Sequence, residues 1–165
     1  MTQLPPTLSR AEAHLYFATW IVMRSPLILS ADFAHNAPRR SGSNWPSWIL
    51  PLVKNEHAIA ISQDALSAQG HRLWSSGVNG SNTNASAVFV PPGELEIWSG
   101  PLANGDSAVM LANRGERIAR INNTFALQKL GCVNVSVYDV FGKRELGSYA
   151  RRYIRTSCVG YAFVA

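Results

Sequence analysis

The sequence predicts an α/β segment followed by an all-β antiparallel sandwich. In the N-terminal part, a capped amphipathic helix leads directly into a short, wholly apolar strand, which is typical of α/β architecture. After Gly70, short segments of alternating polarity follow one another with glycine-containing turns between them, which is typical of an antiparallel β unit. We therefore place a domain boundary near Gly70 and predict two units, residues 1–70 and 71–165.

The first helix has both a start and a stop signal. Ser9 and Glu12 have the spacing of a capping box, in which each side chain accepts a hydrogen bond from the other residue's amide. Pro26 disfavours helical geometry at the residue before it, so we expect the helix to end at about Arg24. Apolar residues at helical spacing mark its buried face: Leu15, Phe17, Ala18, Trp20, Ile21 and Val22.

Two further elements complete the N-terminal unit. Residues 26–29 (PLIL) are apolar at every position, which predicts a strand buried on both faces. Residues 46–56 are expected to be helical, with Trp48, Ile49 and Leu52 inward and a kink or a later start caused by Pro51. Residues 59–61 are expected to extend into a short strand or turn.

Six alternating segments are predicted as strands of a sandwich with six to eight strands: residues 72–74, 94–98, 107–113, 117–122, 133–139 and 153–164. Asn104, Gly105 and Asp106 form a strong hairpin signal between two of these segments. Gly115 and Gly142 are expected to mark further turns.

Bulk properties exclude several classes of function. The formal net charge is +5, but the cations are spread along the chain. Arg151 and Arg152 would point to opposite faces of a strand, so no basic stripe for nucleic acid is predicted. The apolar runs are too short to cross a bilayer, and the N-terminus lacks the apolar region of a signal peptide. The histidines are scattered without metal-ligand spacing, and no metal or other cofactor is expected.

Four N-x-S/T sequons are present, at Asn79, Asn84, Asn122 and Asn134. They indicate possible N-glycosylation and a secreted or vesicular parent protein, although the chain shows no leader sequence. Cys132 and Cys158 are the only cysteines. Both fall in strand-like segments, so they could form a disulfide across the sheet or remain as two buried thiols.

Five segments, in order, resemble the C-terminal third of the melibiase-type α-galactosidases, glycoside hydrolase family 27. They are residues 13–20 (AHLYFATW), 25–30 (SPLILS), 54–64 (KNEHAIAISQD), 94–102 (ELEIWSGPL) and 108–115 (AVMLANRG). The resemblance implies the last helix, strand and helix of a (β/α)8 barrel, followed by the family's C-terminal antiparallel domain. It departs from the family pattern at Ser62 and Ala65, and in the longer polar stretch 75–93.

The resemblance assigns no catalytic or substrate-binding residue to this chain. The family uses two aspartates, in accord with the carboxyl pair that retaining glycosidases need, and their motifs are absent here. Asp32 follows a predicted barrel strand, but an aspartate there is expected to cap a turn. Glu94 and Glu96 share a strand face and are expected to be solvated. Asp64 is expected to make a turn.

The remaining candidates also have structural interpretations. Trp45 and Trp48 flank Pro46 and could form a platform for a sugar ring, although packing against the barrel end is favoured. Trp74 and Trp98 lie on consecutive predicted strands and are expected to be core residues of the β domain. Tyr138, Asp139 and Arg144 lie near a predicted turn and could form a surface ion pair of little energetic value.

The sequence thus predicts the C-terminal part of an α-galactosidase, a retaining hydrolase of terminal α-galactosyl residues, from a secreted, lysosomal or vacuolar parent. The chain alone is expected to be inactive, and its first helix to lack the barrel partners for its apolar face. The α-galactoside would be bound by the full-length parent. The alternative is a non-catalytic β-sandwich module that binds carbohydrate or protein.

Overall fold

The computed structural model describes residues 8–28, 46–76, 95–115, 119–122, 134–150, 154–157 and 163–164. Within these residues, helices precede strands. The helices are α1 (Arg10–Val22), α2 (Ile49–Val53) and α3 (Glu56–Ser62). The strands are β1 (His71–Ser75), β2 (Leu95–Pro101), β3 (Ser107–Asn113), β4 (Ala119–Asn122), β5 (Asn134–Asp139), β6 (Arg144–Ala150), β7 (Ile154–Ser157) and β8 (Phe163–Val164).

The predicted capping box starts α1. The Ser9 amide donates to Glu12 Oε2 at 2.8 Å, and the Glu12 amide donates to Ser9 Oγ at 3.3 Å. These bonds satisfy two of the amides that a helix start leaves without partners. The helix ends two residues earlier than predicted, at Val22, and Arg24 adopts a left-handed conformation with φ of 53°. The prediction for this element is confirmed apart from its last turn.

The predicted strand at residues 26–29 is not formed over its described part. Residues 26–28 have no strand pairing. The Ile28 amide instead donates to the Pro26 carbonyl, and the Ile28 side chain is 58% exposed. A strand needs a neighbour to accept and donate its backbone hydrogen bonds, and the described residues offer none here.

The second helical segment is divided in two. Residues 46–56 were predicted as one helix with a kink at Pro51, but α2 is short and contains Pro51 near its middle. Asn55 then caps α3, accepting from the Ala58 amide at 3.1 Å. The prediction of a strand or turn at residues 59–61 is wrong, because they are helical and bury Ile61 against the shared core.

The strands form three antiparallel groups in the described part of the chain. One sheet has the order β1-β2-β3-β8, and two pairs are β4-β7 and β5-β6. The hairpin predicted at Gly105 joins β2 to β3, and Gly105 has φ of 90°. The segment predicted at 153–164 is two strands, β7 and β8, in different groups. Strand β6 was not predicted, because Arg144, Glu145 and Gly147 break its alternation of apolar and polar residues.

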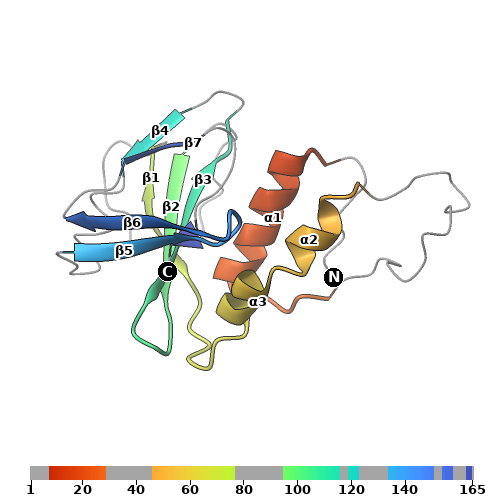
Figure 1. Cartoon of the computed structure of the whole chain (residues 1–165), viewed down its shortest axis with the longest axis horizontal. Helices are drawn as coiled ribbons and strands as arrows, with labels where there is room; N and C mark the ends of the chain where they lie inside the picture. Colours follow the sequence, from red (N-terminus) through yellow and green to blue (C-terminus); the bar gives the residue numbers. More distant parts are fainter. Residues whose placement is uncertain are drawn as a thin grey trace, which may run out of the picture.

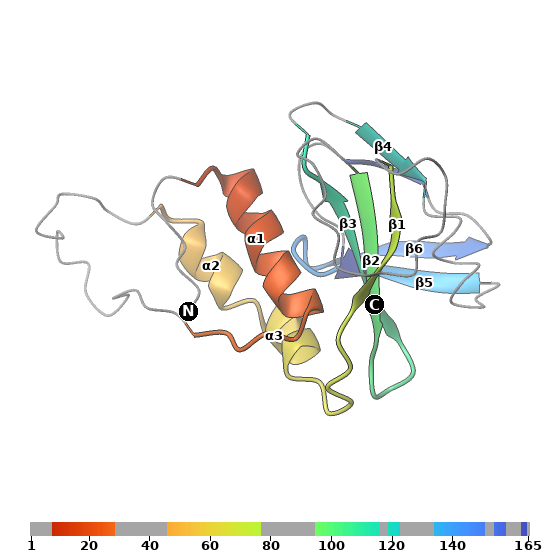
Figure 2. The same cartoon turned by 180° about the vertical axis from the view of Figure 1, so that it is seen from behind.

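The four-stranded sheet is the middle layer of the molecule. Side chains of β3 alternate between its faces. Ala108, Met110 and Ala112 enter a cluster with the helices, whereas Val109 and Leu111 enter a second cluster with β4 and β5. Helix α1 lies between this sheet and α2 in both views (Figures 1 and 2). The order of layers is therefore outer strands, middle sheet and helices.

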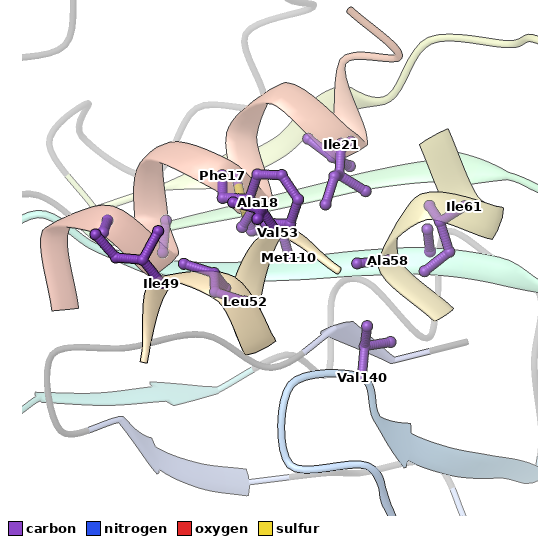
Figure 3. Packing of buried hydrophobic residues seen from close by; sticks show 14 of the residues in the cluster. Phe17, Ala18, Ile21, Ile49, Leu52, Val53, Ala58, Ile61, Met110 and Val140 are labelled. Carbon is purple, nitrogen blue, oxygen red and sulfur yellow. The ribbon is translucent and has the colours of Figure 1, made fainter. Parts of the chain in front are cut away.

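The helices and the sheet share one hydrophobic core. Phe17 and Ile21 of α1 are 1% and 0% exposed, and they lie in one cluster with Leu52 of α2, Ile61 of α3 and Met110 of β3. Figure 3 shows these side chains together, with Val140 reaching the same cluster from the end of β5. The sheet of this chain thus covers part of the apolar face that was expected to need barrel partners, while Leu15 and Trp20 of that face are half-buried.

The two predicted core tryptophans lie on opposite faces of the middle sheet. Trp74 packs on the cluster shared with the outer strands, and Trp98 packs on the cluster shared with the helices. Both are half-buried rather than fully buried. Each tryptophan therefore lies at the periphery of its cluster.

Two glycines allow the helical unit and the sheet to approach closely. The Gly70 amide donates to the carbonyl of Val22 at 2.8 Å. A Cβ at Gly70 would lie 2.8 Å from both Val22 Cγ2 and Val22 O, and one at Gly100 would lie 2.9 Å from the Gly70 Cα. The end of α1, the segment before β1 and strand β2 thus meet at backbone contact distance.

We predict that Gly70→Ala lowers the free energy of unfolding by about 1–3 kcal/mol, the usual cost of forcing an extra methyl into a packed site. Urea denaturation monitored by tryptophan fluorescence measures this value. The neighbouring Gln69→Ala, at an exposed position, should change it by less than about 0.5 kcal/mol. Equal stability of the Gly70→Ala variant and the unaltered chain would contradict the close approach.

Candidate functional site

Many of the residues singled out from the sequence lie outside the described residues. These are Asp32, Trp45, Glu94, Cys132, Cys158, Arg151, Arg152, Asn79 and Asn84. Asn122 ends β4 and Asn134 begins β5, so these two sequons lie at strand ends. The disulfide and the glycosylation of the sequons remain predictions.

Glu96 is the most deeply buried charged residue among those described. Its carboxylate accepts from Arg72 Nη1 at 2.9 Å, from Arg114 Nε at 2.9 Å and from Trp98 Nε1 at 3.1 Å. Its side chain is 0% exposed, compared with 9% for Arg72 and 34% for Arg114. The prediction that Glu96 is solvated is wrong, because the face of β2 that bears it is covered in the folded chain.

Hydrogen bonding keeps this carboxylate ionised. Burial raises the pKa of Glu96, but the hydrogen bonds from Arg114, Arg72 and Trp98 outweigh it, and the net pKa is lower than usual. A carboxylate with a lowered pKa and both oxygens engaged cannot serve as a general acid near neutral pH. Glu96 is therefore a structural anion that joins β1, β2 and the end of β3.

Asp139 is also buried rather than exposed at the surface. Its side chain is 5% exposed and accepts from the Gly142 amide at 2.9 Å. The predicted ion pair with Arg144 is present at 3.8 Å, but the Arg144 side chain is 66% exposed. The main role of Asp139 is to close the turn between β5 and β6. Tyr138 has a different partner, His57 of α3, with its Oη 3.0 Å from the imidazole Nε2.

Asp64 makes the predicted turn and also joins the helical unit to the β2–β3 hairpin. Its Oδ1 accepts from the Leu66 amide at 3.0 Å, and both carboxylate oxygens accept from the Ala103 amide, at 3.0 and 3.1 Å. Burial raises the pKa of Asp64, but these amide bonds and Arg24 bring it below its usual value.

Arg24 completes this junction from the end of α1. Its Nη1 lies 3.4 Å from Asp64 Oδ1, and its Nη2 donates to the Pro101 carbonyl at 2.9 Å. The Arg24 side chain is 4% exposed and that of Asp64 is 16% exposed, so the charge pair is largely shielded from solvent. We call Arg24, Asp64 and their hairpin partners Pro101 and Ala103 the Arg24–Asp64 junction. The sequence analysis identified the turn at Asp64 but not its link across the chain.

An open groove of about 500 Å³ lies between the start of α1, helix α2 and the β5–β6 turn. The described residues that line it are Arg10, His14, Ser47, Trp48, Pro51, Leu52, Asn55, Phe141, Gly142 and Lys143. Trp48, the predicted platform residue, is half-buried and also packs on the helical core. The structure therefore allows both interpretations of Trp48, since it packs inward and lines a groove.

Four of the described carboxylates have structural roles. Glu96, Asp64 and Asp139 are each held by the partners given above, and Glu12 caps α1. Among the described residues, no three His, Cys, Asp or Glu side chains gather as metal ligands. Within the same residues, no helix has the length and apolarity needed to span a membrane.

Comparison with known proteins gives consistent relatives. Residues 92–159 match the family described as the α-galactosidase C-terminal β-sandwich domain. An α-galactosidase of Zygotorulaspora mrakii is 33% identical over 115 residues, covering 70% of this chain and 21% of the relative. α-Galactosidase 5 of Saccharomyces cerevisiae is 29% identical over 151 residues, which cover 87% of this chain and 29% of the relative. The chain thus spans less than a third of the length of these relatives.

Solved structures share the fold. The chain is similar to the α-galactosidase of Saccharomyces cerevisiae, with a TM-score of 0.69 and 20% identity over 96% of this chain and 43% of that one. α-Galactosidase I of Mortierella vinacea gives a TM-score of 0.69 and 21% identity, and the match covers 95% of this chain and 35% of that one. The similarity includes the helices as well as the strands, because it covers nearly the whole chain.

We predict that Glu96→Ala lowers the free energy of unfolding by about 3–5 kcal/mol, because it leaves the buried Arg72 without its anion. Glu145→Ala is the matched control, since Glu145 is an exposed carboxylate on β6, and its removal should cost less than about 0.5 kcal/mol. Urea denaturation at neutral pH measures both variants. Similar stabilities for the two would show that the arginine network contributes nothing.

The lowered pKa of Glu96 also predicts a pH dependence. A carboxyl whose folded pKa lies below its unfolded value stabilises the fold above the unfolded pKa of about 4.3. This stabilisation is lost as the pH falls through the folded pKa. The stability difference between the unaltered chain and Glu96→Gln should therefore be largest near neutral pH and shrink below about pH 4. A difference that stays constant from neutral to acid pH would contradict the ionised state of Glu96.

Proposed function

Residues 92–159 are the C-terminal β-sandwich domain of glycoside hydrolase family 27, the melibiase-type α-galactosidases, and from this premise we propose that the chain is the closing part of an enzyme that hydrolyses terminal α-galactosyl residues. In this proposal the helices end a catalytic (β/α)8 barrel within residues 1–70, and residues 71–165 form the sandwich attached to it. The role of the present residues is structural.

The order of the N-terminal elements supports the barrel interpretation. Helix α1 leads into residues 25–28, which have no strand pairing, and helices α2 and α3 follow later in the chain. A strand at residues 26–29, formed when the rest of the barrel is present, would complete the helix-strand-helix sequence of a barrel unit. Ile28 is 58% exposed, as expected for a buried-strand residue whose neighbouring strands are supplied by other residues. We propose that these neighbours belong to the rest of the barrel.

The observation that supports the structural role most directly is the fixed attachment of the sandwich to the helices. A shared core, the close approach at Gly70 and the Arg24–Asp64 junction all connect the same two units. Independent domains commonly meet at smaller and more polar interfaces that allow relative motion. These contacts hold the sandwich firmly to the helices, which supports a structural role in stabilising the end of a barrel.

The catalytic groups are proposed to lie outside the present residues. A retaining glycosidase needs two carboxyl groups about 5–5.5 Å apart, whereas the Glu12, Asp64, Glu96 and Asp139 carboxylates are occupied by structural hydrogen bonds. The solved α-galactosidase of Saccharomyces cerevisiae was crystallised with raffinose. We accordingly propose an α-galactoside as the substrate of the complete enzyme.

Activity of two purified proteins tests this proposal. The protein encoded by the complete open reading frame that contains this sequence should hydrolyse 4-nitrophenyl α-galactoside, whereas residues 1–165 alone should not. Turnover by residues 1–165 at an enzyme-like rate would refute the structural role. A folded complete protein without turnover would refute the hydrolase assignment.

Arg24→Gln in the complete protein tests the structural role separately. It should lower Tm by several degrees while leaving kcat and KM unchanged at temperatures well below unfolding, because the described partners of Arg24 are the Asp64 carboxylate and the Pro101 carbonyl, which have structural roles. Lys54→Gln is a charge-matched control at an exposed position. An altered KM for Arg24→Gln with unchanged Tm would contradict a structural junction.

A further inference from the structure

We propose that the groove between α1, α2 and the β5–β6 turn binds a sugar acid, a saccharide ring that bears a carboxylate. The inference rests on the shape, the rings and the charges of the groove. It does not depend on the proposed hydrolase function, because it concerns a site made only by residues of this chain.

The size and the floor of the groove suit a small ligand. Its volume of about 500 Å³ lies within the range of small-molecule sites, roughly 300–1,000 Å³. Its floor is fixed, because Asn55 is 2% exposed and joins two elements. The Asn55 side chain donates to the Val140 carbonyl at 2.9 Å and accepts from the Ala58 amide at 3.1 Å. The β5–β6 turn is therefore held against the helices, and the groove is preformed.

Three rings line one part of the groove. The imidazole of His14 lies at a centroid distance of 5.2 Å from Phe141, edge to face, and 6.3 Å from Trp48. Its Nδ1 is 2.7 Å from the Arg10 carbonyl, which fixes the ring. Burial is the main cause of the lowered pKa of His14, so the imidazole is neutral at pH 7. Rigid aromatic surfaces of this kind suit the apolar face of a sugar ring.

The described lining of the groove carries positive charge. Arg10 and Lys143 are exposed cations of the lining, and no acidic residue is among the described residues that line it. Neither cation forms an ion pair with another described residue. Lys143 extends from the β5–β6 turn, where its φ is 51°, and Arg10 extends from the first turn of α1. An anionic group on the ligand would therefore be bound from two sides of the groove.

The mixed lining distinguishes a sugar acid from simpler ligands. A flat aromatic acid would cover the rings but leave the Ser47 hydroxyl at the rim without a ligand partner, whereas sugar hydroxyls can bond it. A neutral sugar has no charge for the two cations to bind, and an inorganic anion has no ring face for the aromatic side chains to contact. A sugar acid has a partner for the aromatic rings, for the two cations and for the Ser47 hydroxyl.

Titration of the purified chain tests the proposal, with D-galacturonate, D-galactose, benzoate and sodium sulfate compared at equal ionic strength. Binding is followed by isothermal calorimetry and by the NMR signals of the tryptophan indoles. We expect saturable galacturonate binding that shifts one indole signal. The affinity for each of the other three compounds should be lower by a factor of about ten or more.

The double variant Arg10→Gln/Lys143→Gln should reduce galacturonate affinity about tenfold or more. Both positions are exposed, so thermal unfolding should be unchanged. Lys54→Gln, an exposed cation outside the described lining, should bind like the unaltered chain. Four results would each overturn the proposal: no galacturonate binding, equal binding of galactose or benzoate, equal binding of sulfate, or full affinity in the double variant.

Discussion

The structure depends on a middle sheet whose β2–β3 hairpin is buried on both faces. Helices cover one face, and the outer strands cover the other, so β3 has no solvated side over most of its length. A separate hydrophobic cluster lies on each of these faces. Because the same strand belongs to both, removing the helices would expose one face of β3, and removing the outer strands would expose the other. The helices and the outer strands therefore stabilise the same strand from opposite faces.

This arrangement explains why charged groups occur inside the molecule. A carboxylate on the helix-facing side of β2 loses its water when the sheet is covered, and it is tolerated only with arginine partners and further hydrogen bonds. Glu96 has both. The Arg24–Asp64 junction follows the same rule at the opposite end of β2, beside Pro101. Two ion-pair sites thus mark the two ends of the face on which the helices pack.

The family relationship and the groove concern different parts of this design. The relatives share the β-sandwich and the overall fold, and the proposed hydrolase role assigns these residues a structural part only. The groove lies where the β5–β6 turn reaches past the sheet to α1 and α2, with Asn55 holding these elements together. A rigid attachment between two units therefore also creates a preformed cavity at their boundary.

The sequence by itself determined the local elements: the capping box at Ser9, the hairpin at Gly105, strand β3 to the residue and the turn at Asp64. These features depend on neighbours within a few positions, and their signals are local. Only the tertiary structure decided that residues 26–28 are unpaired, that Ile61 is helical and that Glu96 is buried. Burial and strand pairing depend on residues distant in the chain, and alternation within one segment cannot tell a solvated face from a covered one.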